Sequence, residues 1–269
     1  MPRDLGDVLH YFLPAPENDA DEIGAGSATT EAAGRGAELH AALPLLALPV
    51  ADRDVVRAAL AWNLGVEIAR LGGRVSIVTR RSPDTALLWP EAGKGPLGTE
   101  VVHTPAEDLA ALRCAALDIA VARAAEARDG GLVLVCVPPD WLRPSPEEIS
   151  MLRWFLLFST SDRRDLMETY ARAKFLLRRD RDACVGVTIH GARRIADAER
   201  AFGKLAHAAS RHLDRTPVSY GLLVDDLHVY RAIVARRPIG LEHPQSPAAR
   251  ALRDVAQLLL EDARKSAVV

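Results

Sequence analysis

The sequence predicts one doubly wound α/β domain, in which helices cover both faces of a single, mostly parallel sheet. Two observations carry this prediction. Short apolar runs alternate with amphipathic helical segments along most of the chain, and the runs are continuous, as strands buried on both faces require. About half of the 269 residues are apolar (49%), which is enough to bury a sizeable core. The alternation shows neither an internal repeat nor a second domain.

The chain begins with a segment, residues 1–14, that is predicted to form a short amphipathic helix ending at Pro14. Its apolar face consists of Leu5, Val8, Leu9 and Phe12. Residues 15–40 are rich in Ala, Gly, Glu and Thr and almost free of large apolar side chains, so we expect a flexible linker. The α/β domain is expected to span residues 41–264. The N-terminal helix either docks on this domain or binds a partner protein.

The first βαβ unit follows the linker. The apolar run ALPLLALPV predicts a buried strand, an amphipathic helix follows up to Gly72, and VSIVT at 75–79 predicts the next strand. A right-handed crossover should join them. Further strands are predicted at 132–137, 154–159, 183–189 and 218–224, and helices near 106–128, 162–179, 192–213, 226–236 and 246–263.

Composition argues against several classes of protein. The net charge of −2 gives no general attraction to nucleic acid or to anionic membranes. No apolar run reaches the roughly 20 residues that cross a bilayer, and the first residues lack the pattern of a signal peptide. Cys114, Cys136 and Cys184 lie far apart, and we expect small buried side chains without disulfide or metal-ligand roles. These features predict a cytoplasmic globular protein.

The second half of the chain carries a resemblance. Residues 184–247 include CVGVTIHGARRIADAERAFGKLAHAASRHL, VSYGLLVDDLHVYRAIVARRPI and EHPQSP. This order resembles the MinD/ParA superfamily, and within it the flagellar-number regulators called FlhG, over residues 43–262. WNLGVEIARLGGRVSIVT in the first half is similar to the same family. The residues in step with the family pattern are Gly221, Leu223, Asp226, Ala232, Ile233, Pro238, Pro244, Ser246 and Pro247.

The family's phosphate-binding loop does not carry over to this chain. The family sequence Lys-Gly-Gly-x-Gly-Lys-Thr should fall where this chain has ADRDVVRA, without a glycine to turn successive N–H groups toward phosphate. Two carboxylates of this segment would face a triphosphate, and Arg57 replaces the catalytic lysine, either as a solvated arginine or as an anion contact. The degenerate loop consists of Ala51, Asp52, Arg53, Asp54, Val55, Val56, Arg57 and Ala58.

The resemblance also places the family's magnesium and adenine contacts on residues that cannot replace them. Thr79 stands for the aspartate that ends the second strand, Cys136 or Val137 for the metal-side aspartate, and Thr188 for the adenine-reading asparagine. Asp140, a few residues later, is either a substitute carboxylate or a polar loop residue. We therefore expect no catalytic residue, no metal and no cofactor, with ATP and magnesium bound only if the chain is a divergent enzyme.

The leading functional hypothesis is a pseudo-ATPase, a binding or regulatory module in positioning, motility or cell-division machinery, with a protein partner bound through the N-terminal helix. One alternative is a divergent ATPase that holds nucleotide through Arg57, Asp140 and the loop after Ser159. Another is a DNA-associated partition protein that uses the basic residues of helix 162–181. The chain ends in RKSAVV, too short for a membrane helix. It is expected to be a monomer or a nucleotide-independent dimer.

Three local features complete the predictions. Residues 91–100, EAGKGPLGTE, superficially look like a phosphate loop, but they lack the second lysine and run into VVHT instead of a helix, so they predict a surface turn. Ser161 or Asp162 should cap the helix that follows. The histidines are expected to be ordinary surface or helix-face residues; they include His190, His207 and His212.

Overall fold

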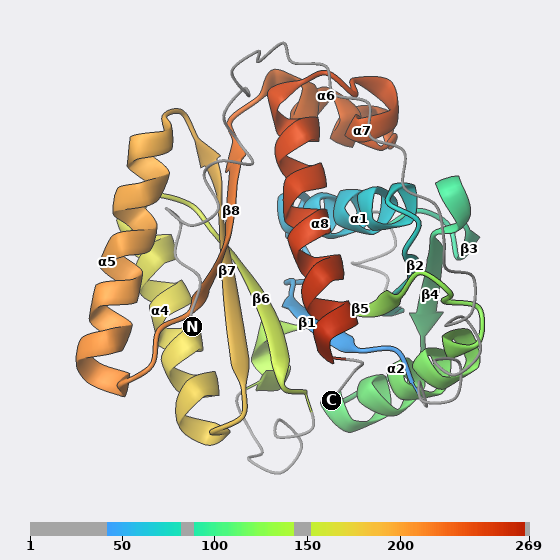
Figure 1. Cartoon of the computed structure of the whole chain (residues 1–269), viewed down its shortest axis with the longest axis horizontal. Helices are drawn as coiled ribbons and strands as arrows, with labels where there is room; N and C mark the ends of the chain where they lie inside the picture. The colour runs from blue at the N-terminus through green and yellow to red at the C-terminus, as the bar shows by residue number, and fades with distance from the viewer. Residues whose placement is uncertain (1–41, 82–88, 143–151, 267–269) are drawn as a thin grey trace, which may run out of the picture.

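The computed structural model describes residues 42–81, 89–142 and 152–266. The predicted N-terminal helix (1–14) and linker (15–40) lie outside the described residues. The described residues form a three-layer α/β domain, with a central sheet between two layers of helices (Figure 1). None of the described helices combines the length and the apolar character that crossing a membrane requires.

One eight-stranded sheet forms the centre of the domain, in the order β3-β4-β2-β5-β1-β6-β7-β8. Every neighbouring pair is parallel except β3 with β4 at one edge. This confirms the predicted doubly wound, mostly parallel sheet. The strands are β1 (Leu45–Pro49), β2 (Arg74–Arg80), β3 (Gly93–Lys94), β4 (Glu100–Thr104), β5 (Gly131–Val137), β6 (Trp154–Ser159), β7 (Cys184–Ala192) and β8 (Val218–Val224).

Strand β1 lies in the middle of the sheet, between β5 and β6. Its residues Leu46, Ala47 and Leu48 have no exposed surface, as expected for an apolar strand covered on both faces. In register, Leu48 lies beside Cys136 on β5, and Ala47 lies beside Phe155 on β6. Because these strands are parallel, the loops that follow them meet at one edge of the sheet, which we call the carboxyl edge.

Helices cover both faces. The connection from β1 to β2 runs along the sheet in one direction, and the later crossovers that contain helices run in the opposite direction. Because each crossover is right-handed, α1 lies on one face of the sheet and the later crossover helices lie on the other. Helix α8 packs on α1 and on β8, with α6 and α7 beside it, while α4 packs on α5 (Figure 1). The helices are α1 (Val55–Arg70), α2 (Leu109–Ala124), α4 (Arg163–Arg179), α5 (Ile195–Leu213), α6 (Leu227–Ala235), α7 (Ile239–Glu242) and α8 (Pro247–Ser266).

The structure adds elements that the sequence pattern does not predict. Strand β4 has the sequence EVVHT, in which only Val101 and Thr104 are buried, so its polar residues hide the strand pattern. The expectation that the cysteines are buried is wrong for two of the three. Cys136 is buried in β5, whereas Cys114 lies on the exposed side of α2 and Cys184 is exposed at the first residue of β7.

Candidate functional site

The turn between β1 and α1 is built without left-handed backbone. No residue from 51 to 58 has a positive φ angle. Asp54 precedes the first residue of α1, and its N–H donates to the Ala51 carbonyl at 3.0 Å. The Asp54 carboxylate accepts the backbone N–H of Arg57 at 2.9 Å and so caps the helix. A side-chain anion of the protein therefore occupies the position at this helix N-terminus that would otherwise attract a phosphate group.

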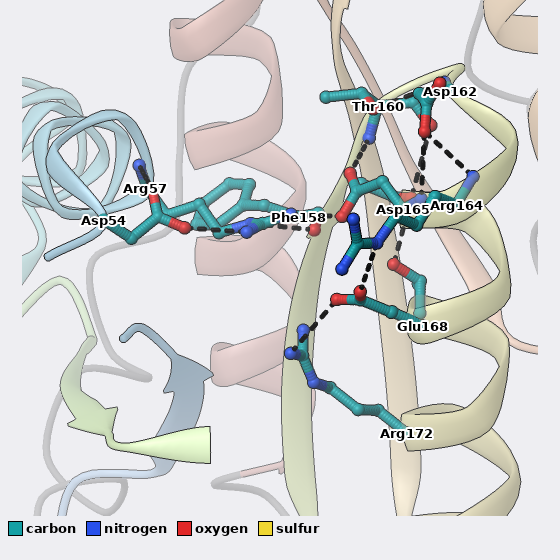
Figure 2. A network of polar contacts seen from close by, with 11 residues as sticks. Asp54, Arg57, Phe158, Thr160, Asp162, Arg164, Asp165, Glu168 and Arg172 are labelled. Carbon is teal, nitrogen blue, oxygen red and sulfur yellow. Dashed lines mark hydrogen bonds and ion pairs between the residues drawn. The ribbon is translucent and has the colours of Figure 1, made fainter. Parts of the chain in front are cut away.

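Arg57 lies in a network of acceptors from three parts of the chain (Figure 2). Its guanidinium donates to Asp54 at 2.7 Å, to Asp165 at 2.6 Å and to the carbonyl of Phe158 at 3.2 Å. The Arg57 side chain is only 18% exposed. The expectation of a solvated arginine is therefore wrong, because the side chain folds inward and joins the start of α1 to the end of β6 and the first turn of α4.

The charges in this network hold one another ionised. Burial by itself would raise the pKa of Asp165, but the N–H of Thr160, at 2.6 Å, and the positive charge of Arg57 outweigh it and leave the pKa below its usual value. Burial likewise lowers the pKa of Arg57, and the carboxylates of Asp165 and Asp54 more than reverse that effect. Both partners are charged at neutral pH, and the ion pair is complete without any outside anion.

His190, at the carboxyl end of β7, lies next to this network. Burial, followed by the charge of Arg57, lowers the pKa of His190 to about 4, so the ring is neutral at pH 7. Its ring meets that of Phe158 edge-on, with the centroids 6.4 Å apart. The Nε2 atom is buried and has no hydrogen-bond partner within the described part of the chain. The expectation of an ordinary surface histidine is therefore wrong for His190, whereas His207 and His212 are exposed.

The positions assigned to magnesium and adenine contacts are buried and carry no carboxylate. Thr79 and Cys136 lie side by side on β2 and β5, each 3% exposed, and burial raises the pKa of the Cys136 thiol. Thr188 lies beside Phe158 and is fully buried. Among residues 42–81, 89–142 and 152–266, no group of three or more His, Cys, Asp or Glu side chains could hold a metal ion.

Asp52 and Asp140 lie apart from the Arg57 network. Asp52 forms an ion pair with Arg80 at the end of β2, and the Arg80 guanidinium lies 5.4 Å from the centre of the Trp141 ring. Asp140 lines a cavity of ≈ 410 Å³ against α4, together with Glu168 and other residues. The structure therefore does not bring Asp140 to Arg57, as the divergent-ATPase hypothesis would require, since all three acceptors of Arg57 come from elsewhere.

A triphosphate with magnesium does not fit these residues. The β1–α1 turn has no residue with the positive φ angle that would turn successive N–H groups toward one phosphate. The Asp54 carboxylate also accepts one of the N–H groups at the start of α1. Arg57 is engaged by two carboxylates, and the strand ends nearby supply Thr79 and Cys136 in place of magnesium ligands.

The remaining local predictions are confirmed. Asp162 caps α4 by accepting the N–H groups of Arg164 and Asp165 at 2.8 and 3.3 Å. Residues 91–100 form a short antiparallel pair and a single helical turn, mostly exposed, with no α-helix after them. Sequence reasoning missed Asp165 and the Phe158 carbonyl as partners of Arg57, and the Thr160 N–H as a donor to Asp165. No motif marks these three residues as a site, since they lie at the end of β6 and just after it, about one hundred residues from Arg57.

The strand order, the position of α1 after β1 and the helices on both faces define the class of fold, that of the MinD/ParA-type P-loop NTPases. The MinD cell division protein of Aquifex aeolicus superposes with a TM-score of 0.61 at 13% identity, covering 81% of this chain and 97% of that one. The septum site-determining protein MinD of Pyrococcus horikoshii OT3, solved with Mg-ADP, gives 0.58 at 11% identity, covering 82% and 97%.

A complex of Cyanothece McdA with ATP is also similar, with a TM-score of 0.52 at 10% identity over 82% of this chain and 97% of that chain. No model of a protein family matches the sequence. No curated protein matches it either. These structural similarities confirm the MinD/ParA-like fold expected from residues 43–262, and at 10–13% identity they show the fold alone.

Proposed function

We propose that this chain is a MinD/ParA-fold binding or regulatory module that does not hydrolyse nucleotide, related to the flagellar-number regulators and acting in positioning, motility or cell-division machinery. The observation that supports the proposal most is the network of Asp54, Arg57 and Asp165. In the family pattern Arg57 stands at the position of the catalytic lysine. Here its charge is directed into the protein, to two carboxylates at 2.7 and 2.6 Å.

Electrostatics explain why this network opposes a triphosphate. A phosphate at the N-terminus of α1 would lie against the Asp54 carboxylate, which accepts the Arg57 N–H at 2.9 Å. Each such like-charge contact near 4 Å costs about 1–4 kcal/mol at the effective dielectric of a protein surface or of water. To gain Arg57 as a partner, the phosphate would also have to take it from Asp165 and leave that half-buried carboxylate uncompensated.

Nucleotide binding tests the proposal directly. Titration of the full chain with a fluorescent ATP analogue, with and without magnesium, should give no saturable signal in the micromolar range and no phosphate release. The Arg57→Ala variant should give the same flat titration. Micromolar binding followed by turnover would overturn the proposal, and turnover abolished by both Arg57→Ala and Asp140→Ala would establish the divergent ATPase instead.

We further propose that a protein partner binds through the N-terminal helix, by the apolar face formed by Leu5, Val8, Leu9 and Phe12. A deletion of residues 1–14 tests this assignment by comparison of the proteins that co-purify with each form. Loss of one defined protein, restored by the intact helix but not by a Leu9→Asp helix, is the expected result. An unchanged set of co-purifying proteins would show that the helix serves the chain's own domain.

A further inference from the structure

The segment that contains helices α4 and α5 is basic. Residues 162–215 hold 13 Arg and Lys but only 8 Asp and Glu, a net charge of +5 in a chain whose net charge is −2. Part of this charge is paired locally, since Glu168 lies 3.5 Å from Arg164 and 3.8 Å from Arg172. Nine other basic residues of this segment are exposed or half-buried and have no carboxylate partner within the described ranges. Five of them are here called the α4/α5 basic face: Lys174, Arg178, Arg181, Lys204 and Arg211.

The basic face extends to the amino edge of the sheet, the edge at which the parallel strands begin. Helix α4 follows β6 and returns to the start of β7, and α5 returns in the same way to the start of β8. The last residues of both helices therefore lie at the amino edge, and Arg178, Arg181 and Arg211 lie there with them. Strand β1 is parallel to β6 and begins at the same edge.

The chain enters the domain next to this face. The backbone N–H of Leu43 donates to the carbonyl of Ala120 on α2 at 3.2 Å. The crossovers from β4 to β5 and from β6 to β7 run in the same direction along the sheet, so right-handed connections put α2 and α4 on the same face. Strands β1, β6 and β7 are neighbours at about 4.8 Å per step, so the start of β7 lies only about 10 Å from the point of entry.

The segment that precedes this point has the opposite charge. Residues 15–40 contain six carboxylates and one arginine, a net charge of −5 against the +5 of residues 162–215. The carboxylates are Glu17, Asp19, Asp21, Glu22, Glu31 and Glu38. A chain of 26 residues with this much Gly and Ala has an average reach of about 25–30 Å, more than the roughly 10 Å between β1 and the start of β7.

We propose that the acidic segment 15–40 lies on the α4/α5 basic face of its own molecule and occupies it against any other polyanion. Tethering gives the segment an effective concentration in the millimolar range, so weak individual ion pairs suffice for occupancy. Because exposed charges are screened within about 8 Å at physiological ionic strength, the contact should weaken with salt. The proposal does not depend on the loss of nucleotide hydrolysis, since no residue of the Arg57 network takes part.

Carbodiimide cross-linking of the intact chain can locate the segment, because the chain has only four lysines. Lys174 and Lys204 belong to the basic face, while Lys94 on β3 and Lys265 on α8 serve as internal controls. At about 1 µM protein and low salt, we expect carboxylates of residues 17–38 to couple to Lys174 or Lys204 at least ten-fold more than to Lys94 or Lys265. In 0.5 M NaCl that preference should fall at least five-fold.

Charge reversal supplies the matched variants. Arg178→Glu/Arg181→Glu should remove most of the coupling, whereas Arg231→Glu/Arg250→Glu, which places the same charge change on α6 and α8, should leave it unchanged. All four arginines are exposed, so both variants should keep the melting temperature of the parent.

Four results would overturn the proposal. The first is equal coupling to all four lysines, and the second is coupling that neither salt nor the Arg178→Glu/Arg181→Glu variant reduces. The third comes from a mixture of heavy-isotope and normal protein: links found only between the two kinds of copy would assign the contact to a second molecule. The fourth is binding of a non-specific 30-base-pair DNA that Arg178→Glu/Arg181→Glu weakens but that is no tighter after Glu17→Gln, Asp19→Asn, Asp21→Asn and Glu22→Gln together. That result would mean that the segment does not occupy the face.

Discussion

The Asp165→Asn variant tests the idea that the Arg57 network is a structural ion pair. The substitution keeps the size of the side chain and removes its charge. Arg57 then keeps Asp54 and the Phe158 carbonyl but loses its charged partner at 2.6 Å, and the amide offers one acceptor oxygen in place of two. The N–H of Thr160 also loses a charged acceptor at 2.6 Å. The network would be weakened at the point where α4 meets the β1–α1 turn.

The magnitude follows from the burial of the pair. Hydrogen bonds to charged groups contribute about 1.5–3 kcal/mol each, and removing one partner of a fully buried ion pair costs about 3–5 kcal/mol. Here both side chains are 18% exposed, and Arg57 keeps two acceptors. Solvent screening therefore reduces the expected loss in the free energy of unfolding to about 2 kcal/mol. For a domain of this size, that loss lowers the melting temperature by about 4–8 °C.

Urea denaturation followed by circular dichroism measures this loss, and Asp197→Asn is the matched control. Asp197 pairs with Arg200 in an exposed position on α5, so its substitution should change the free energy of unfolding by less than about 0.5 kcal/mol. The Arg57→Met/Asp165→Asn double variant should be destabilised by clearly less than the sum of the single effects. Additive effects, or an Asp165→Asn variant as stable as the parent, would refute the role given to this ion pair.

Three further predictions concern other parts of the fold. The pKa of His190 is lowered to about 4 in the folded chain, so the unfolded chain binds more protons between pH 6.5 and 4. The free energy of unfolding should therefore fall by up to about 3 kcal/mol as the pH is lowered over that range, and urea denaturation of His190→Gln should lack this loss. Gly186→Ala should destabilise by about 1–3 kcal/mol, because a Cβ atom there would lie 2.3 Å from the Tyr220 ring, while Gly203→Ala, with nothing within 4 Å, should stabilise by about 0.5–1 kcal/mol. Equal thermal shifts of the two variants would contradict this close contact between β7 and Tyr220. A thiol reagent should label Cys114 and Cys184 quickly in the native protein and Cys136 only after unfolding, and labelling of all three at one rate would contradict the burial of β5.

The sequence predicts most of the fold because the relevant signals are local. A continuous apolar run marks β1 whatever lies beside it, and an aspartate before a helical segment marks the start of α4. The same reasoning failed for β4, whose Glu100 and His103 break the apolar pattern. It failed also for Cys184, where the first residue of a strand is exposed although the strand is not.

The sequence by itself determined the absence of glycine between residues 51 and 58, in the turn between the first strand and the first helix of a MinD/ParA-like fold. Only the tertiary structure decided what Arg57 does instead. Its partners Phe158 and Asp165 are 101 and 108 residues away, and they meet Arg57 because β6 lies next to β1. Conformational preferences act over a few residues, whereas ion pairing depends on which strands become neighbours, so the charge on Arg57 is visible in the sequence and its partners are not.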